Sequence, residues 1–366
     1  VLAYNTHYLG YNANMLANEM YLDSADQRSS VVSLAKQVGY TPRSAVSSTA
    51  KIDVLVNNGS GASITMSRGT KFTTTVDGTS YSFVNNADVS VSPVDGVYKF
   101  SNLDIYEGTY LNYKYTANTS DTDQRFIIPN DNVDTTTLTV KIQESASDST
   151  TNTYTLASGI TGIDSTSKVY FLQEVENGRF EVYFGDGVLG KAIADGNIVI
   201  LDYITCNLDE PNGASTFTLN GNIGGFTNVT ITTVNNANGG DAHESIKSIK
   251  YNAPRDYTSQ DRAVTADDYK VLVKSLYANA QSVQVYGGED AATPDYGKVY
   301  ISIKAKSGSN LTTVTKESIV QSLKSYAVAS VVPVIIDPET THITLTTTFK
   351  YDSSLTIKDV STLQTN

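Results

Sequence analysis

Apolar side chains recur at intervals of three and four residues after Thr265, which predicts an amphipathic helix there. They are Tyr269, Leu272, Val273, Leu276 and Tyr277. Thr265 has the profile of a helix N-cap, and Asp267 and Asp268 fall in the first turn, where the helix dipole favours negative charge. Val264 and Tyr269 occupy the two positions of a hydrophobic staple. We therefore expect the helix to begin directly after Thr265.

The segment before this helix, residues 253–262, has no apolar period. Pro254 disfavours a helix until the cap at Thr265, so the sequence predicts a loop. This loop concentrates polar and charged groups, namely Arg255, Asp256, Gln260, Asp261 and Arg262. An arginine can pair with a carboxylate in a fixed forked geometry. Two interpretations stay open: a contact with a second copy or a neighbouring subunit, or an Arg–Asp pair that anchors the loop within its own chain.

The N-terminal region also has helical spacing. A loose apolar face comprises Leu9, Met15, Leu16, Met20 and Leu22. A second, clearer face comprises Val31, Leu34, Ala35 and Val38. Residues Ser24 to Gln27 fit a capping box before the second helix, and Gly39 with Pro42 predicts its end.

From residue 45 to 234 the apolar period shortens to two, which predicts strands. The alternating sets are Ile52, Val54 and Val56; Phe72, Thr74 and Val76; and Leu138, Val140 and Ile142. Tyr110–Tyr115 is a further predicted strand. Four Asp-Gly pairs, at 77–78, 95–96, 186–187 and 195–196, are typical of hairpin turns.

Helices return after residue 243. We expect a short helix at 244–251, the helix after Thr265, strands at 283–286 and 298–304, a helix capped by Thr315 with Ile319, Leu323 and Tyr326 on its apolar face, and strands at 334–336 and 343–351. This order predicts a compact α+β unit with helices on one sheet face.

The expected fold class is α+β, rich in β structure and multidomain. We predict N-terminal helices in 1–44, central antiparallel β domains in 45–150 and 151–240, an α+β unit in 241–351, and the start of a truncated region in 352–366.

Composition narrows the possible functions. The net charge of −12 argues against a nucleic-acid surface, which needs clustered Lys and Arg. A single cysteine, Cys206, rules out an internal disulfide framework and is expected to be buried. The longest apolar run, 331–336, is far short of a membrane span. The first residue is Val1 and the last lies in a polar stretch, so both ends are expected to be cut.

Residues 185–190 match the dinucleotide-binding pattern G-x-G-x-x-G letter for letter. That site needs a helix directly after the glycines, whose N-terminus holds the pyrophosphate. Here a turn at 195–196 and a strand-like run at 198–201 follow instead. We therefore predict a structural turn, with Gly185, Asp186, Gly187 and Gly190 as its residues and no cofactor.

Other candidate chemistry is weak. His7, His243 and His342 are far apart in sequence, and Cys206 stands alone, so no metal site is expected. The acidic group Asp121, Asp123, Asp131 and Asp134 lacks the Gly and Glu of a calcium loop and is interpreted as a solvated loop. No Gly-x-Ser-x-Gly elbow occurs, and no pair of acids stands out for glycoside hydrolysis, so no catalytic residues are predicted.

Three segments carry a resemblance. The first is Ala253-Pro254 followed by Gln-Asp-Arg-Ala-Val-Thr-x-x-Asp-Tyr at 260–269, the second is Leu-Ala-Lys at 34–36 through Pro42, and the third is Phe-Gly-Asp-Gly-x-x-Gly at 184–190 followed by Gly196-Asn197. They resemble the baseplate wedge proteins of T-even-type contractile-tailed phages, part of the baseplate-J-like family. The resemblance covers residues 30–42, 180–200 and 240–351. Residues 60–165 depart from it.

The resemblance implies a structural protein of the virion tail baseplate, made in the host bacterial cytoplasm, with no enzymatic activity and no small-molecule substrate, nucleic acid or membrane as partner. Its partners would be a second copy of itself and other wedge subunits, bundled through the N-terminal helices. The wedges would close into a ring around the tail tube, and rearrangement of that ring would trigger sheath contraction. The interface residues expected on this basis are Met15, Leu16, Val31 and Leu34 in the helices, and Arg255, Gln260, Asp261, Arg262, Thr265, Asp268 and Tyr269 around the later helix.

Two other functions remain open from the sequence. One is a carbohydrate-binding or receptor-binding appendage, in which Tyr-rich strands such as Tyr110–Tyr115 would line an exposed groove. The other is a polysaccharide-degrading enzyme.

Overall fold

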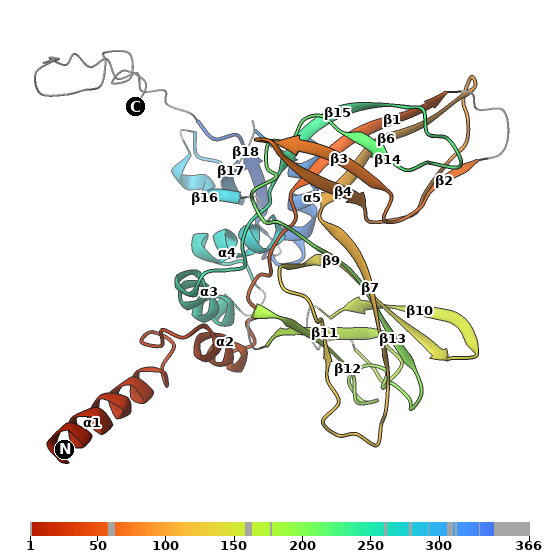
Figure 1. The fold of residues 1–366 in the computed structure, drawn as a ribbon. Helices are drawn as coiled ribbons and strands as arrows, with labels where there is room; N and C mark the ends of the chain where they lie inside the picture. The colour runs from red at the N-terminus through yellow and green to blue at the C-terminus, as the bar shows by residue number, and fades with distance from the viewer. Residues whose placement is uncertain are drawn as a thin grey trace, which may run out of the picture.

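The computed structural model describes residues 2–57, 63–157, 163–175, 178–259, 262–277, 280–291, 293–305, 310–311, 313–328 and 330–339. Two large β-sheets lie on one side of the molecule, and most of the helices lie on the other (Figure 1). The expected strand at 343–351 and the expected region 352–366 lie outside the described residues.

The N-terminal region forms two helices, α1 (Leu2–Asn18) and α2 (Arg28–Gln37). The predicted capping box at 24–27 is wrong. The N-cap of α2 is Gln27, which makes no side-chain cap hydrogen bond. The Glu19 carboxylate instead accepts hydrogen bonds from the backbone N–H groups of Asp26 and Gln27, at 2.9 and 3.3 Å. The Ser24 hydroxyl donates to the carbonyl of Asn18.

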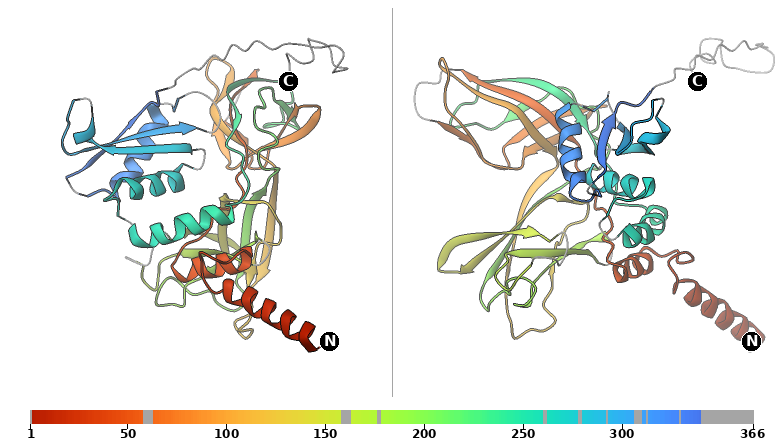
Figure 2. Two further views of the ribbon diagram at one scale, coloured as in Figure 1. Left: turned by 90° about the vertical axis from the view of Figure 1, so that its left-hand side faces the viewer. Right: turned by 180° about the vertical axis from the view of Figure 1, so that it is seen from behind.

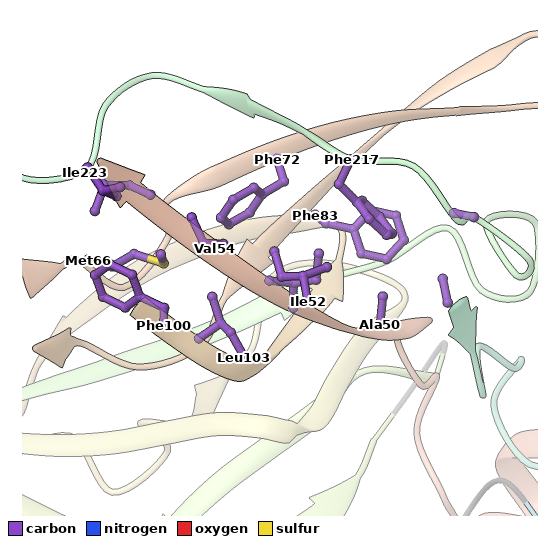
Figure 3. Packing of buried hydrophobic residues seen from close by; sticks show 14 of the residues in the cluster. Ala50, Ile52, Val54, Met66, Phe72, Phe83, Phe100, Leu103, Phe217 and Ile223 are labelled. Atoms are coloured by element: carbon purple, nitrogen blue, oxygen red, sulfur yellow. The ribbon is translucent and has the colours of Figure 1, made fainter. Parts of the chain in front are cut away.

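The first large sheet has the strand order β14-β3-β4-β6-β1-β15, and every neighbouring pair is antiparallel. Its strands are β1 (Thr49–Asn57), β3 (Lys71–Val76), β4 (Thr79–Asn85), β6 (Val97–Glu107), β14 (Thr218–Asn220) and β15 (Val229–Asn238). The pair β2 (Ile64–Met66) and β5 (Val89–Val91) forms a small sheet beside it. Alternate residues of β1 are buried, as the period of two predicted. They meet Phe72, Phe83 and Phe100 in one core (Figure 3).

The second large sheet has the order β7-β13-β9-β10-β11-β12-β8. Its strands are β7 (Thr109–Thr116), β8 (Phe126–Ile127), β9 (Val133–Ser145), β10 (Asp148–Leu156), β11 (Val169–Glu174), β12 (Phe180–Phe184) and β13 (Ile198–Thr205). The two end strands approach each other, because the Tyr115 hydroxyl donates to the carbonyl of Ile127 at 2.5 Å. The sheet therefore curls around its own core.

The expected arrangement of the β region needs two corrections. The pair β10–β11 is parallel, whereas all strands were expected to be antiparallel. A parallel pair needs a long connection between its strands, and residues 157–168 supply that length. The boundary expected at residue 150 falls inside β10. The second sheet uses residues 109–205 and is inserted between β6 and β14 of the first sheet.

The C-terminal unit contains α4 (Ala266–Leu276), β16 (Ala280–Gly287), a short 3-10 helix (Gly288–Asp290), β17 (Lys298–Ala305), α5 (Thr313–Lys324) and β18 (Val332–Ile336). The strand order is β16-β17-β18. Tyr269 and Val273 of α4 and Leu323 of α5 share one buried cluster with Ile301 and Ile303 of β17. Both helices thus pack on one sheet face, as predicted. Helix α5 begins at Thr313, two residues before the expected cap.

The prediction of a loop at 253–262 is wrong for residues 253–259, which are helical. Helix α3 (Ile246–Ser259) continues through Pro254. Ile249 and Ala253 on α3 are fully buried against Val31 and Ala35 of α2. A proline inside a helix costs a hydrogen bond, but burial of this apolar face holds α3 together across it.

Candidate interface surfaces

Helix α1 has an unusual surface. It carries no Asp, Glu, Lys or Arg, and none of its residues is buried. Seven large apolar side chains on it are exposed, from 43% for Met15 to 84% for Leu2. Both views of Figure 2 show the helix extending away from the rest of the molecule. A helix of this length, about 25 Å, gains little from propensity when it contains a Gly and four Asn.

The apolar side chains of α1 form two stripes. The tyrosine stripe is Tyr4, Tyr8, Tyr11 and Met15, at intervals of four, three and four residues. The leucine stripe is Leu2, Leu9 and Leu16, at intervals of seven. Adjacent positions such as Tyr8 and Leu9 are turned by about 100° from each other on a helix, so the stripes lie on different sides. The helix therefore offers two separate apolar faces.

The four helical residues expected at an interface divide into two groups. Met15 and Leu16 are exposed on α1. The prediction for Val31 is wrong, because this side chain is fully buried between α2 and α3 of its own chain. Leu34 is half-buried against the same cluster. The stripe on α2 is thus covered by a helix about 215 residues further along the chain.

Helix α2 is fixed to the body by a buried ion pair. The Arg28 guanidinium donates to both oxygens of Glu174 on β11, at 2.7 and 2.9 Å, and the Glu174 side chain is 1% exposed. Arg28 also donates to the carbonyl of Glu244. Because buried charges need a partner, this fork defines the position of α2 against the second sheet.

A second buried carboxylate, Glu244, ties the segment after α2 to α3. It accepts hydrogen bonds from the Tyr40 hydroxyl at 2.8 Å, the backbone N–H of Arg43 at 3.2 Å, the Ser248 hydroxyl at 2.5 Å and the Asn252 amide at 2.9 Å. Burial, together with the nearby charge of Glu244, raises the pKa of Tyr40. Sequence reasoning did not identify Glu244 or Arg28, since their partners lie far away in the chain.

The expected contact surface around α4 is only partly exposed. Thr265 and Asp268 form a reciprocal capping box: Thr265 Oγ1 accepts from the Asp268 N–H, and Asp268 accepts from the Thr265 N–H at 2.7 Å. Tyr269 is 1% exposed inside the C-terminal core, so it cannot meet another subunit. The staple is wrong as well, because Val264 is 66% exposed.

The expected polar loop has a different geometry. Arg255 lies on α3, where its guanidinium stacks over the Tyr251 ring at 3.6 Å and donates to the Tyr251 carbonyl at 2.7 Å. Arg262 is exposed, and its backbone N–H donates to Ser259. Gln260 and Asp261 lie outside the described residues. On the surface between α3 and α4, Tyr257 and Arg262 are therefore exposed and Arg255 is half-buried.

Residues 185–190 form a tight turn. Gly187 donates to the carbonyl of Gly190 at 3.1 Å, and Asp186 accepts from the backbone N–H groups of Val188 and Leu189 at 2.9 and 3.0 Å. A Cβ at Gly185 would lie 2.2 Å from the Leu189 carbonyl oxygen, so a larger residue does not fit. No helix follows before β13 in the described residues.

The remaining candidate residues lie apart or are buried. Among the residues that the structure describes, no group of three or more His, Cys, Asp and Glu could hold a metal ion. Asp134 is buried, which corrects the interpretation of a solvated acidic loop; burial raises its pKa, and it accepts from the Ser47 N–H at 2.8 Å. Of the tyrosines in 110–115, Tyr113 is 40% exposed and packs edge to face on Tyr115, which in turn contacts Phe126.

No helix among the described residues has the length and apolar character needed to cross a membrane.

Two protein-family models match this chain. The third domain of the bacteriophage baseplate wedge protein gp6 matches residues 113–209, and C-terminal domain I of the baseplate structural protein gp6 matches residues 265–336. The first match coincides with most of the second sheet, and the second with the unit from α4 to β18.

The chain is 29% identical to the baseplate wedge protein gp6 of Enterobacteria phage T4, in an alignment that covers 92% of this chain and 54% of the T4 protein. It thus spans about half the length of that relative. A solved chain in the baseplate of the anti-feeding prophage covers 91% of this chain and 65% of its own length at 11% identity, with a TM-score of 0.34, too low to relate the two folds. The two domain matches and the long alignment thus agree with each other, and they support a T4-like baseplate wedge protein.

Proposed function

We propose that this chain is a structural subunit of a phage tail baseplate wedge and that α1 is its docking helix. The observation that carries the proposal is an uncharged helix with seven exposed large apolar side chains and no buried residue. Apolar side chains in this number stabilise a helix when a neighbour covers them, each contributing about 1.5–3 kcal/mol on full burial. The work of the subunit is to hold neighbours at defined angles, with no chemical step.

The two stripes of α1 favour two neighbours. We assign one stripe to a second copy of the chain and the other to a further wedge subunit, which agrees with the paired copies and larger wedge partner that the family resemblance implies. Wedges of this kind would close into a ring in the virion tail. Rearrangement of the ring would trigger sheath contraction, which requires interfaces that differ in free energy between two states.

Light scattering of the full-length protein, alone and with its candidate wedge partners, tests this function. The wild type is expected to associate. Replacing Leu2, Leu9 and Leu16 by Ser is expected to remove one contact, and replacing Tyr4, Tyr8 and Tyr11 by Ser the other. Tyr296→Ser is the matched control, because Tyr296 is 80% exposed but far from α1 in the chain. A wild-type protein that stays monomeric in every mixture would contradict the proposal.

The surface between α3 and α4 is a second proposed contact. Arg262 is exposed there and Arg255 is half-buried, whereas Tyr269 is buried. Arg262→Ala is expected to weaken association with wedge partners. The opposite result, unchanged association with lower stability, would assign Arg262 to anchoring within its own chain.

A further inference from the structure

The two large sheets have separate apolar cores. The cluster beneath β1, β3, β4 and β6 and the cluster inside β7 to β13 have no residue in common. Near the junction of the sheets lie several buried polar side chains, including Ser48, Glu107, Asp134, Thr137 and Asp202, beside apolar ones such as Ile204. Contacts of this polar kind allow relative motion more readily than a shared apolar core does.

The covalent connection between the sheets is narrow. Strand β6 passes into β7 at Gly108, and the chain returns after β13, whose Thr205 pairs with Thr109. Gly108 has a φ of +126°, and a Cβ there would lie 2.0 Å from the Thr205 carbonyl oxygen, so this position requires glycine. The right-hand view of Figure 2 shows the two sheets spreading apart from this crossing.

Glu107 reinforces the crossing. It is fully buried and accepts hydrogen bonds from the backbone N–H of Asn207 at 2.8 Å and from the Asn207 amide at 2.7 Å. The two crossing strands are therefore linked to each other directly, at the place where each leaves one sheet for the other.

A separate contact, which we name the Arg68 clasp, joins the sheets away from the crossing. Arg68 follows β2, and its guanidinium donates to Asn86 at 2.6 Å on its own side. Towards the second sheet it donates to the carbonyl of Thr137 at 3.2 Å, forms an ion pair with Asp202 at 3.4 Å and stacks over the Tyr110 ring at 4.9 Å. The Arg68 side chain is 13% exposed.

The acceptor side of the clasp is built in advance. Asp202 is the one charged residue in the apolar strand β13, and its side chain is 3% exposed. The Asn112 amide donates to it at 2.5 Å and Lys141 at 3.1 Å, both from neighbouring strands of the same sheet. Burial raises the pKa of Asp202, but these hydrogen bonds and one from Tyr110 outweigh it, so the carboxyl stays ionised at neutral pH.

We propose that the crossing at Gly108 is a hinge between the two sheets and that the Arg68 clasp latches it at the angle seen in the structure. The second sheet then moves as one body when the clasp opens, because its own core and its Asp202–Lys141 pair stay intact. The proposal concerns the chain by itself and goes beyond its assignment to a baseplate.

Spin-label distance measurement on the full chain tests the latch. Val94→Cys and Val188→Cys place labels on turns of the two sheets, since both side chains are 71% exposed. Cys206 competes little for the label, because burial raises the pKa of its thiol to about 11. The wild-type clasp is expected to give one narrow distance distribution. Arg68→Ala is expected to broaden it and shift its maximum.

Lys99→Ala is the matched control, because it removes a cation from an ion pair with Asp53 that lies within the first sheet, without touching the contact between the sheets. Its distribution should stay as narrow as that of the wild type. If Arg68→Ala does not fold, as judged by circular dichroism, Asn86→Ala serves instead, since it removes the acceptor that orients Arg68. A folded variant of either kind with the wild-type distribution would overturn the proposal, as would equal broadening in Lys99→Ala.

Discussion

Helices α1 and α4 both carry apolar stripes, yet they stand in opposite relation to the rest of the chain. In α4 the stripe residues Tyr269, Leu272 and Val273 are buried. The N-terminus is capped by Thr265 and Asp268, and the helix carries charged side chains outside the stripe. In α1 the apolar side chains are exposed and no charged side chain accompanies them. A period of three and four residues thus shows that a helix has an apolar face. In these two helices the presence of charge at the remaining positions distinguishes the face that the chain covers from the one that it leaves exposed.

The largest change in the free energy of unfolding is expected when Tyr269 is replaced. Tyr269→Ala removes a fully buried ring from the core under α4 and should lower the free energy of unfolding by about 3–5 kcal/mol. Urea unfolding followed by circular dichroism measures it. Tyr269→Phe should cause no such loss, since the Tyr269 hydroxyl is buried and has no hydrogen-bond partner among the described residues. Equal losses in the two variants would contradict the packing of α4.

The next largest loss of stability is expected when the Arg28–Glu174 ion pair that anchors α2 is broken. Arg28→Ala leaves Glu174 buried and unpaired, at a cost of about 3 kcal/mol. The control is Arg179→Ala, whose partner Asp131 is 68% exposed; it should change stability by less than about 1 kcal/mol. Thermal unfolding of both variants gives the comparison. A similar small effect of both would mean that α2 does not depend on this ion pair.

Removal of the N-cap side chain is expected to lower stability in α4 but not in α2, and this loss is smaller than the two above. Thr265→Ala removes a side chain that caps the helix, and we expect a loss of about 1 kcal/mol. Gln27→Ala, at the N-cap of α2, should be neutral within about 0.5 kcal/mol, because Gln27 makes no side-chain cap hydrogen bond. Denaturant midpoints of the two variants test this pair of expectations, and a loss in Gln27→Ala as large as in Thr265→Ala would argue against it.

The smallest effect on the isolated chain is expected in α1. The double variant Leu9→Ala, Leu16→Ala should keep its free energy of unfolding within about 0.5 kcal/mol, since both side chains are exposed. Its association with a partner should weaken by about 3 kcal/mol, or roughly a hundredfold in dissociation constant. Unfolding and sedimentation experiments on one sample measure both. A destabilised monomer would show that α1 packs on its own chain.

Local pattern was sufficient for much of the fold. The alternation at Ile52, Val54 and Val56 correctly predicted β1, and the cap at Thr265 correctly predicted the start of α4. Both signals arise from residues close together in the chain, so they can be read without knowing the tertiary structure.

The errors come from contacts between distant residues. Pro254 lies inside α3 because its helical face is buried against Val31, and no local signal indicates that partner. The same contact removes Val31 from the expected interface. Asp202 and Glu174 bind arginines more than a hundred positions away. A lone acid in the apolar run of β13 was the only trace of the clasp in the sequence.

The turn at 185–190 explains why a match to the G-x-G-x-x-G motif need not create a nucleotide-binding site. In such sites the free backbone N–H groups after the glycines receive phosphate oxygens. Here the Asp186 side chain already accepts the N–H groups of Val188 and Leu189, so the protein supplies its own anion. An aspartate between the first two glycines, with a strand in place of the helix, is thus a practical criterion for rejecting nucleotide binding in other sequences that match the G-x-G-x-x-G motif.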